Sequence, residues 1–556
     1  MNKNGSRLSM IRLFLFFSFI ICTLEAQRLD SALQNLERFD QKHLQDYIDK
    51  ELNQSNKEQD IKPNNIINSQ NSHKYFFKSI IFEKTELNLK ENIEIIKTYE
   101  NRILTTQDIL DIISKTTNNL IKKGYSTSAV TIKQIDQINQ ILILEVKVGK
   151  IDNILLNNNL NDRRLKTLPL KNGSVFNIFD LDQAIENLNN ASINTISNIQ
   201  ASNQYGFSNI YLQTQDQPFE FYTNMDNSGQ SDMGEYRSSI AITSNNIFNI
   251  NDSFNLTYSK NFPFAKSGYD EELYFASLSI PINNSKILFS FSNSRTSTKA
   301  YGYASEYTRK NNIYRYKIGL KHILTRINKT KVSIYSNINI KETKNTIDDI
   351  ILETSSGRYN SISIGIETLS SISNGSIFSQ LEYSKGVKLF GSRGNIKNSP
   401  YDTEFDIIKI PLSIQKYIYS NQNYGLLLKS NFAAFYSKDS LLFADKFSIG
   451  SEYTVRGFKD SSVSLDYGTY LNNTLYLKLF DTNKYIQSFS PFIGIDFGYG
   501  RDYYLPNSDK LIGIAYGILY NIGNLNIKAT FSKPIKKSSN MPDEKSPFYL
   551  DISFAI

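Results

Sequence analysis

The sequence predicts a transmembrane antiparallel β-barrel of about sixteen strands, preceded by an N-terminal helix and two small α+β units. From Gln217 to Ile556, apolar and polar residues alternate and turn residues interrupt them about every ten residues, as in barrel strands. Tyr and Phe are abundant, with 35 of each, although the mean hydropathy is only −0.37. Because only every second strand residue of a barrel faces lipid, low hydropathy and many aromatic residues are compatible. A secretory signal at the start of the chain supports this reading.

The first 26 residues are predicted to be a signal peptide. Basic residues precede an apolar run from Leu13 to Leu24, and Ala26 offers a small residue for cleavage. The run is too short to span a bilayer, which needs roughly 20 residues. The single cysteine, Cys22, lies inside the run, so the mature chain is expected to lack disulfides and thiol chemistry. Removing the segment's three basic residues and one acidic residue lowers the net charge from +8 to +6, which does not indicate nucleic acid binding.

Residues 27–50 are predicted to form an amphipathic helix. They contain no Pro or Gly, and apolar residues recur near helical spacing at Leu29, Leu33, Leu36, Phe39 and Leu44. Residues 51–73 are rich in Asn, Gln, Lys and Ser and are expected to be a linker.

Residues 74–150 are predicted to form the first α+β unit. A strand is expected at 75–82, a short helix at 93–103 and a longer helix at 107–123 with Thr106 as its N-cap. Strands at 129–133 and 141–148 complete the unit. Residues 151–216 repeat this order more weakly: a strand at 150–156, a helix at 180–189, and two strands, 196–201 and 209–213, around a turn at Gly206.

The barrel is predicted to occupy residues 217–556. In the stretches 512–520, 525–531 and 548–556, one face is apolar and the other carries polar side chains. A soluble β-sandwich would alternate similarly with its apolar face inside, but the signal peptide and strands of about nine or ten residues favour the membrane. At roughly 20 residues per strand and connection, the 340 residues give about sixteen strands, an even number as such barrels require.

Several stretches resemble those of two-partner secretion transporters, the hemolysin-activator and filamentous-haemagglutinin transporter family of the outer-membrane assembly superfamily. Residues 105–130 (TTQDILDIISKTTNNLIKKGYSTSAV) and 141–154 (ILILEVKVGKIDNI) look like the first POTRA domain of this family. Residues 179–190 (FDLDQAIENLNN) look like the second, and 225–259 are similar to the first barrel hairpin. The resemblance covers nearly the whole mature chain.

The mechanism that the resemblance implies depends mainly on two short motifs. The first is Val455, Arg456, Gly457 and Phe458, which looks like the family's VRG[FY] loop motif. The second spans residues 494–498 and looks like the [FG]xDxG strand motif, with Gly494, Asp496 and Gly498. Each motif alone is weak, but their order near the end of a barrel makes the pair more specific.

Topology suggests that the two motifs meet inside the barrel. The POTRA-like units precede the barrel and so lie in the periplasm; counting strands back from the C-terminus then places residues 437–467 in an external connection of about 30 residues, and connections this long are usually functional. In the family this loop folds into the lumen, where Arg456 would need a carboxylate partner. Asp496 shares strand parity with Gly494 and Gly498, so we expect a salt bridge between Arg456 and Asp496. The alternative is a solvated loop arginine and a lumen aspartate without mutual contact.

The resemblance implies a non-enzymatic outer-membrane transporter of a Gram-negative bacterium. It implies a secreted exoprotein partner with an N-terminal secretion domain, captured at a site within the POTRA domains, and contact with outer-membrane lipid and the barrel assembly machinery. A barrel-assembly insertase and a passive pore are the alternatives, and a membrane enzyme ranks last. No catalytic or cofactor motif is present, and the three histidines, His43, His73 and His322, are too scattered to predict a metal site.

Overall fold

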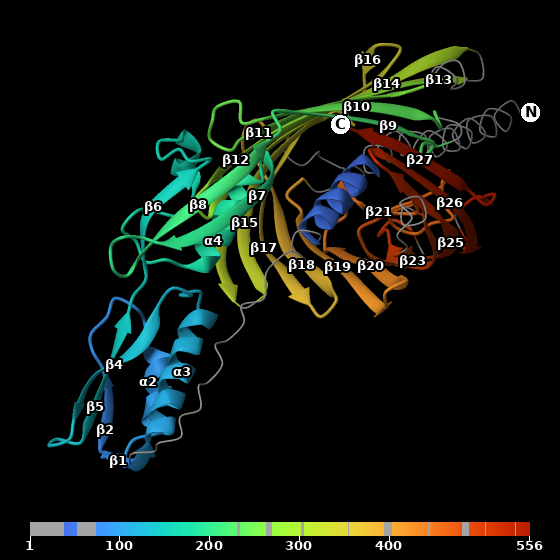
Figure 1. The fold of residues 1–556 in the computed structure, drawn as a ribbon. Coiled ribbons are helices and arrows are strands. Elements are labelled where there is room, and N and C mark those ends of the chain that lie inside the picture. Colours follow the sequence, from blue (N-terminus) through green and yellow to red (C-terminus); the bar gives the residue numbers. More distant parts are fainter. Residues whose placement is uncertain are drawn as a thin grey trace, which may run out of the picture.

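The computed structural model shows an N-terminal helix, two α+β units and a β-barrel (Figure 1). The predicted signal peptide lies outside the described residues, as does most of the linker. The structure describes residues 38–52, 74–230, 234–262, 269–301, 305–327, 329–353, 355–393, 403–442, 445–480, 489–505, 507–539 and 541–556.

The first unit contains seven elements: β1 (Lys74–Phe77), β2 (Ser79–Phe82), α2 (Lys90–Lys97), β3 (Arg102–Thr105), α3 (Thr106–Lys122), β4 (Ala129–Asp136) and β5 (Ile141–Lys147). A sheet of order β2-β5-β4, with β2 parallel to β5, packs its apolar face against the two helices. β1 and β3 form a separate antiparallel pair.

The predicted helix at 93–103 is wrong in its second half. Helix α2 ends at Lys97, and after a turn in which Asn101 adopts a left-handed conformation (φ 55°) the chain forms β3. Leu104 of β3 is buried in the core, and the strand gains backbone pairing with β1 that a longer helix could not provide. Helix α3 is capped by Thr105 rather than Thr106, and Thr105 forms a capping box with Asp108. Its hydrogen bonds to Asp108 hold the pKa of that carboxyl below its ordinary value.

The second unit contains the predicted elements, with boundaries shifted by up to four residues. They are β6 (Lys150–Leu156), α4 (Ile178–Leu188), β7 (Ser192–Ala201) and β8 (Phe207–Asp216), and a 3-10 turn that was not predicted, η1 (Arg163–Thr167), precedes α4. The sheet order is β6-β8-β7, and β6 runs parallel to β8. Figure 1 shows this unit between the first unit and the barrel.

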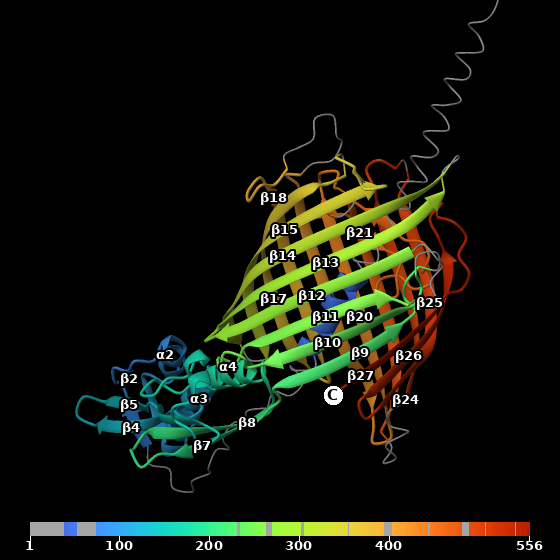
Figure 2. The ribbon, with the colours of Figure 1, turned by 90° about the horizontal axis from the view of Figure 1, so that it is seen from above.

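Sixteen long antiparallel strands in the described residues form the barrel, which closes where β27 pairs with β9. Figure 2 shows their tilt, most clearly in β12 to β15. The strands are β9 (Phe219–Asp226), β10 (Arg237–Asn245), β11 (Ser253–Asn261), β12 (Tyr269–Ile282), β13 (Ser285–Tyr301), β14 (Glu306–Ile327), β15 (Thr330–Ile347), β17 (Gly357–Ile372), β18 (Gly375–Val387), β19 (Asp406–Ser420), β20 (Tyr424–Ser437), β23 (Tyr467–Leu479), β24 (Phe489–Arg501), β25 (Asp509–Ile522), β26 (Leu525–Lys536) and β27 (Phe548–Ala555). After a turn at residues 348–349, the two-residue strand β16 (Ile350–Ile351) pairs antiparallel with the last residues of β15. The predicted barrel and its strand number are confirmed.

The predicted orientation of the barrel faces is confirmed by side-chain exposure. On β24, Ile493 is 61% exposed and Phe497 is 42% exposed, whereas Asp496 between them is fully buried. The apolar face therefore points outward from the barrel and the polar face to the lumen, as in membrane barrels. Among the described residues, no helix is both long and apolar enough to cross a bilayer.

Candidate functional site in the barrel lumen

The connection between β20 and β23 folds into the barrel. Within it, β21 (Phe447–Ile449) pairs with β22 (Val463–Leu465), and the VRGF motif lies between them. Val455 and Phe458 are buried in an apolar cluster with Leu511 of β25 and Met541 of the β26–β27 connection. We call residues 438–442 and 445–466 the lumen loop. The apolar cluster that the loop shares with Leu511 and Met541 holds it inside the barrel.

The structure brings Arg456 and Asp496 together in a bidentate contact. Arg456 donates from Nη2 to Asp496 Oδ1 and from Nε to Oδ2, both at 2.7 Å, and its backbone N–H donates to Oδ2 at 2.9 Å. Arg456 Nη2 also donates to the carbonyl oxygen of Asn473 at 2.9 Å. The arginine side chain is 4% exposed and the carboxylate is fully buried. This planar pairing uses the fork of the guanidinium, which a lysine ammonium does not provide.

Glycines make room for this pair on the barrel wall. A β-carbon at Gly494 would lie 2.2 Å from Arg456 Nη2, and one at Gly498 would lie 2.8 Å from Val455 Cγ2. Gly457 has a φ of 104°, which side chains rarely adopt, and it lies against the backbone of Lys533 and Pro534. The three glycines of the two predicted motifs are therefore where the loop approaches the wall.

Gly513 has the same role, and sequence reasoning missed it. A β-carbon there would lie 1.6 Å from the carbonyl oxygen of Arg456. Asp496 and Gly513 are register partners on β24 and β25, so Gly513 lies beside the salt bridge. Sequence alone gives no signal for this glycine, because the contact depends on strand register.

We expect Gly513→Ala to displace the lumen loop, because the Arg456 backbone must move away from the wall. The secretion that the family resemblance implies should then fall at least about tenfold. The measurement is the partner protein in the culture medium, with heat-modifiable barrel in the outer membrane as the assembly control. Ile514→Ala, which removes an exposed, outward-facing side chain from the next position of β25, serves as the matched control. Equal secretion by the two variants would contradict the role of Gly513.

A second anchor of the lumen loop is Glu544, which sequence reasoning also missed. Its carboxylate accepts hydrogen bonds from the Asp460 backbone at 2.7 Å, from Ser461 Oγ at 2.6 Å and from the Lys459 backbone. Near the base of the loop, Lys446 lies 2.6 Å from Asp502 and 3.4 Å from the buried Asp466. The loop is thus fixed by side chains at several points.

The N-terminal helix, residues 38–52, lies inside the barrel, as the blue helix in Figure 1 shows. It extends two residues into the predicted linker. Its C-terminal end packs Ile48 and Leu52 against Leu369 and Phe378 of the wall. Four of its charged side chains form ion pairs with the wall: Asp40 with Arg315, Lys42 with Asp551 (3.0 Å), Asp49 with Lys429 (3.1 Å) and Glu51 with Lys331 (3.1 Å).

The helix and the lumen loop also contact each other. Arg38 donates to the carbonyl oxygens of Lys459 at 2.6 Å and Ser228 at 2.9 Å. Gln41 accepts a hydrogen bond from Ser451 Oγ at 2.8 Å. Movement of one element therefore disturbs the other.

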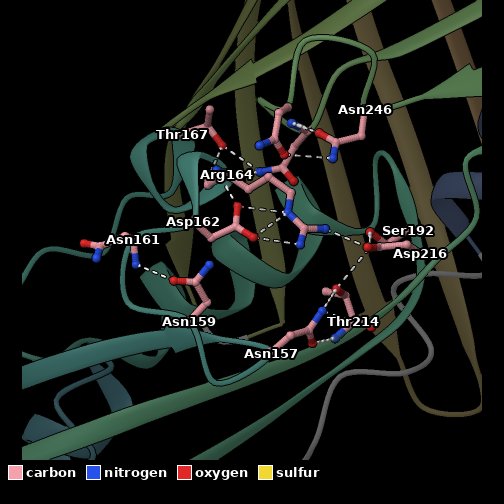
Figure 3. Close-up of polar contacts among 12 residues, drawn as sticks. Asn157, Asn159, Asn161, Asp162, Arg164, Thr167, Ser192, Thr214, Asp216 and Asn246 are labelled. Atoms are coloured by element: carbon pink, nitrogen blue, oxygen red, sulfur yellow. Dashed lines mark hydrogen bonds and ion pairs between the residues drawn. The ribbon is translucent and has the colours of Figure 1, made fainter.

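The second α+β unit is attached to the periplasmic turns of the barrel (Figure 3). Arg164 binds Asp162 at 2.9 Å and Asp216, the last residue of β8, at 2.7 Å. Burial raises the pKa of Asp162, but the hydrogen bonds and charge of Arg164 outweigh this and hold the pKa below its ordinary value. Asn251, from the β10–β11 turn, donates to Thr167 Oγ1 at 2.8 Å. The ion pairs of Arg164 stabilise the unit internally, and the hydrogen bond from Asn251 joins it to the barrel.

In the part of the chain that the structure describes, no group of three or more His, Cys, Asp or Glu side chains is arranged to hold a metal ion. The geometry is that of a channel filled by two elements of its own chain.

A family model described as haemolysin secretion/activation protein ShlB/FhaC/HecB matches residues 206–520, more than half of the chain. The chain belongs to this family. A model of the ShlB-type POTRA domain matches residues 76–149. The protein is thus an outer-membrane secretion transporter, and its POTRA domains lie in the periplasm.

Relatives in the family match most of the chain at low identity. Outer membrane transporter CdiB of Escherichia coli is 23% identical over 488 residues, 86% of this chain and 81% of its own length. Hemolysin transporter protein HpmB of Proteus mirabilis is 23% identical over 524 residues, covering 89% and 88%. The solved structure of CdiB from Escherichia coli shares the fold with a TM-score of 0.87 at 21% identity, covering 95% of this chain and 99% of that one.

Proposed function

We propose that this transporter secretes one large exoprotein, of the hemolysin or haemagglutinin kind, across the outer membrane. The POTRA domains, residues 74–150 and 151–216, would capture the unfolded partner by an N-terminal secretion domain, and the barrel, residues 217–556, would conduct it. Adding a partner strand to a POTRA sheet edge suits an unfolded chain, because backbone hydrogen bonds do not depend on its sequence. Relatives named as hemolysin and CdiB transporters support this proposal.

The observation that carries the proposal is the filling of the lumen. Helix 38–52 is held by ion pairs and a small apolar contact, and the lumen loop by side chains and one bidentate pair. Neither element is a strand of the barrel, so both can leave without breaking it. A passive pore for small solutes would not need two removable elements beside two docked periplasmic domains.

Within this function, we propose distinct tasks for the lumen elements. Helix 38–52, part of the predicted segment 27–50, is a plug. The salt bridge between Arg456 and Asp496 holds the lumen loop, with Val455, Gly457 and Phe458 packing it and Gly494 and Gly498 leaving it room. The signal peptide directs the chain to export, the barrel assembly machinery inserts it and outer-membrane lipid surrounds it.

Transport in this proposal involves no enzymatic step and no cofactor. The partner crosses as an unfolded chain and folds outside, and that folding gives the movement its direction. The tasks assigned to helix, loop and POTRA domains are binding and gating.

We expect deletion of residues 38–52 to raise single-channel conductance several-fold in planar bilayers, because the helix occupies the lumen. Asp49→Asn with Glu51→Gln should give intermittent openings, because it weakens two of the helix's ion pairs with the wall. Glu83→Gln with Glu91→Gln is the matched control, since it makes the same chemical change in two exposed ion pairs of the first POTRA domain. Unchanged conductance after the deletion would show that the helix is not a plug.

A further inference from the structure

The lumen wall that faces the helix is basic. A cavity of about 940 Å³ lies between helix 38–52 and strands β11 to β20, with side chains of α4 at one end. Apart from the helix itself, eight lysine and arginine side chains and four carboxylates of the described residues line this cavity. The wall therefore has an excess of positive charge that something else must balance.

Carboxylates of the helix balance part of this charge. Asp40 pairs with Arg315 on β14 and Glu51 with Lys331 on β15, and both cations line the cavity. Outside the cavity lining, Asp49 of the helix pairs with Lys429 on β20. Lys331 is 7% exposed in this state. When the helix leaves, Arg315 and Lys331 lose partners while they still line a confined passage.

Among the wall cations that need a partner, the strongest example is a pair of like charges on adjacent strands. Arg315 on β14 lies directly opposite Lys341 on β15, and both face the lumen. Like charges in this position destabilise a sheet. Asp40 of the helix binds Arg315, and Asp445 of the lumen loop binds Lys341 at 2.5 Å. The two elements that must move are thus the ones that neutralise this pair.

Lys331 marks the entrance from the periplasm. It lies between Glu51 of the helix, at 3.1 Å, and Glu186 of α4 in the second POTRA domain, at 3.4 Å. A carboxylate that arrives from the POTRA side can replace Glu51 beside Lys331 while Glu186 stays in place. Exchange at this point avoids leaving a buried cation unpaired, which is costly.

We propose that the lumen, once the helix has left it, favours the passage of anions. The wall cations that pair with the helix then bind acidic segments of the exported chain. This inference rests on the proposed secretion function and names the chemistry of the segment that replaces the helix. Confined water and low-dielectric walls strengthen the preference for negative charge.

The first test is ion selectivity in planar bilayers under a KCl gradient. The variant without residues 38–52 should pass chloride in preference to potassium by at least about threefold. Adding Arg315→Glu and Lys341→Glu should reverse the preference. Lys310→Glu, on the outer face of the same strand, is the matched control and should leave the preference unchanged. Potassium selectivity of the helix-free channel, or no effect of the two lumen substitutions, would overturn the inference.

The second test is block of the open channel by short peptides added from the POTRA side. Hexaglutamate should block at a concentration at least about tenfold below that of hexalysine. Should the deletion variant fail to assemble, the full chain with Asp40→Asn, Asp49→Asn and Glu51→Gln provides openings for both measurements. Equal block by the two peptides would overturn the inference.

Secretion measured in the same strains separates the inference from the proposed function. Normal secretion through a cation-selective channel would overturn the anion-favouring passage and leave the secretion function standing. An anion-selective channel in strains that export nothing would support the charge preference and overturn the secretion function.

Discussion

Replacing Arg456 with alanine is expected to lower secretion by about a hundredfold or more while the barrel still inserts. The substitution leaves the carboxylate of Asp496 fully buried without its cation, and losing one partner of a buried pair costs about 3–5 kcal/mol. It also removes hydrogen bonds to Asp496 and Asn473. The lumen loop should then leave its position against the wall. The measurement is the partner in the medium, with heat-modifiable barrel as the assembly control.

Related variants show whether the pair acts as one unit. Asp496→Ala should impair secretion as strongly as Arg456→Ala, and the double variant should be no worse than the worse single one, because coupled residues do not add. Arg456→Lys should recover little, since an ammonium cannot form the bidentate contact. Exchanging the two charges should restore part of the secretion at most, because Gly494 leaves room for a guanidinium on the loop side only.

The matched control is an exposed pair of the same chemistry. Arg358 lies 2.8 Å from Glu342 at the surface, with both side chains more than 40% exposed. Exposed pairs contribute about 0–1 kcal/mol, so Arg358→Ala should leave secretion nearly unchanged. Strictly additive losses from Arg456→Ala and Asp496→Ala, or normal secretion by the Asp496 variant, would show that the two residues do not act as a pair.

The sequence predicted the barrel because strand periodicity is a local signal. Parity along β24 separates Asp496 from the lipid-facing Ile493 and Phe497, so a single strand suffices to assign the two faces. The proposed partner of Asp496 came from the family resemblance combined with this parity. In the structure, Arg456 reaches Asp496 from a loop 40 residues away in the chain, and that contact is not a local property.

The features that were not predicted from the sequence depend on contacts between distant elements. Residues 98–103 were predicted to be the end of a helix, but backbone pairing with β1 makes the last of them part of a strand. Gly513 and Glu544 matter through register and loop packing, which no local pattern reveals. The ion pairs of helix 38–52 join residues several hundred positions apart, so amphipathicity predicted the helix but not its place against the wall.

Deleting residues 74–150 is expected to abolish secretion while heat-modifiable barrel accumulates in the outer membrane. The first POTRA domain has its own apolar core, and the second keeps a separate core and its own contacts with the barrel turns. The barrel should therefore assemble without the first domain, and the loss should fall on capture of the partner. The measurement is the partner in the medium compared with its amount in the periplasm.

The deletion tests capture only if the helix stays in the lumen, and the remaining chain is long enough for the helix to stay there. The segment 53–73 joins helix 38–52 to the first domain, and 21 residues reach at most about 70 Å when extended. In the deletion variant this segment joins the helix directly to the second domain, whose α4 already shares Lys331 with Glu51. Single-channel conductance should therefore stay as low as in the full chain. Low conductance with no secretion would assign capture to the first domain, whereas undiminished secretion would place capture in the second domain or the barrel.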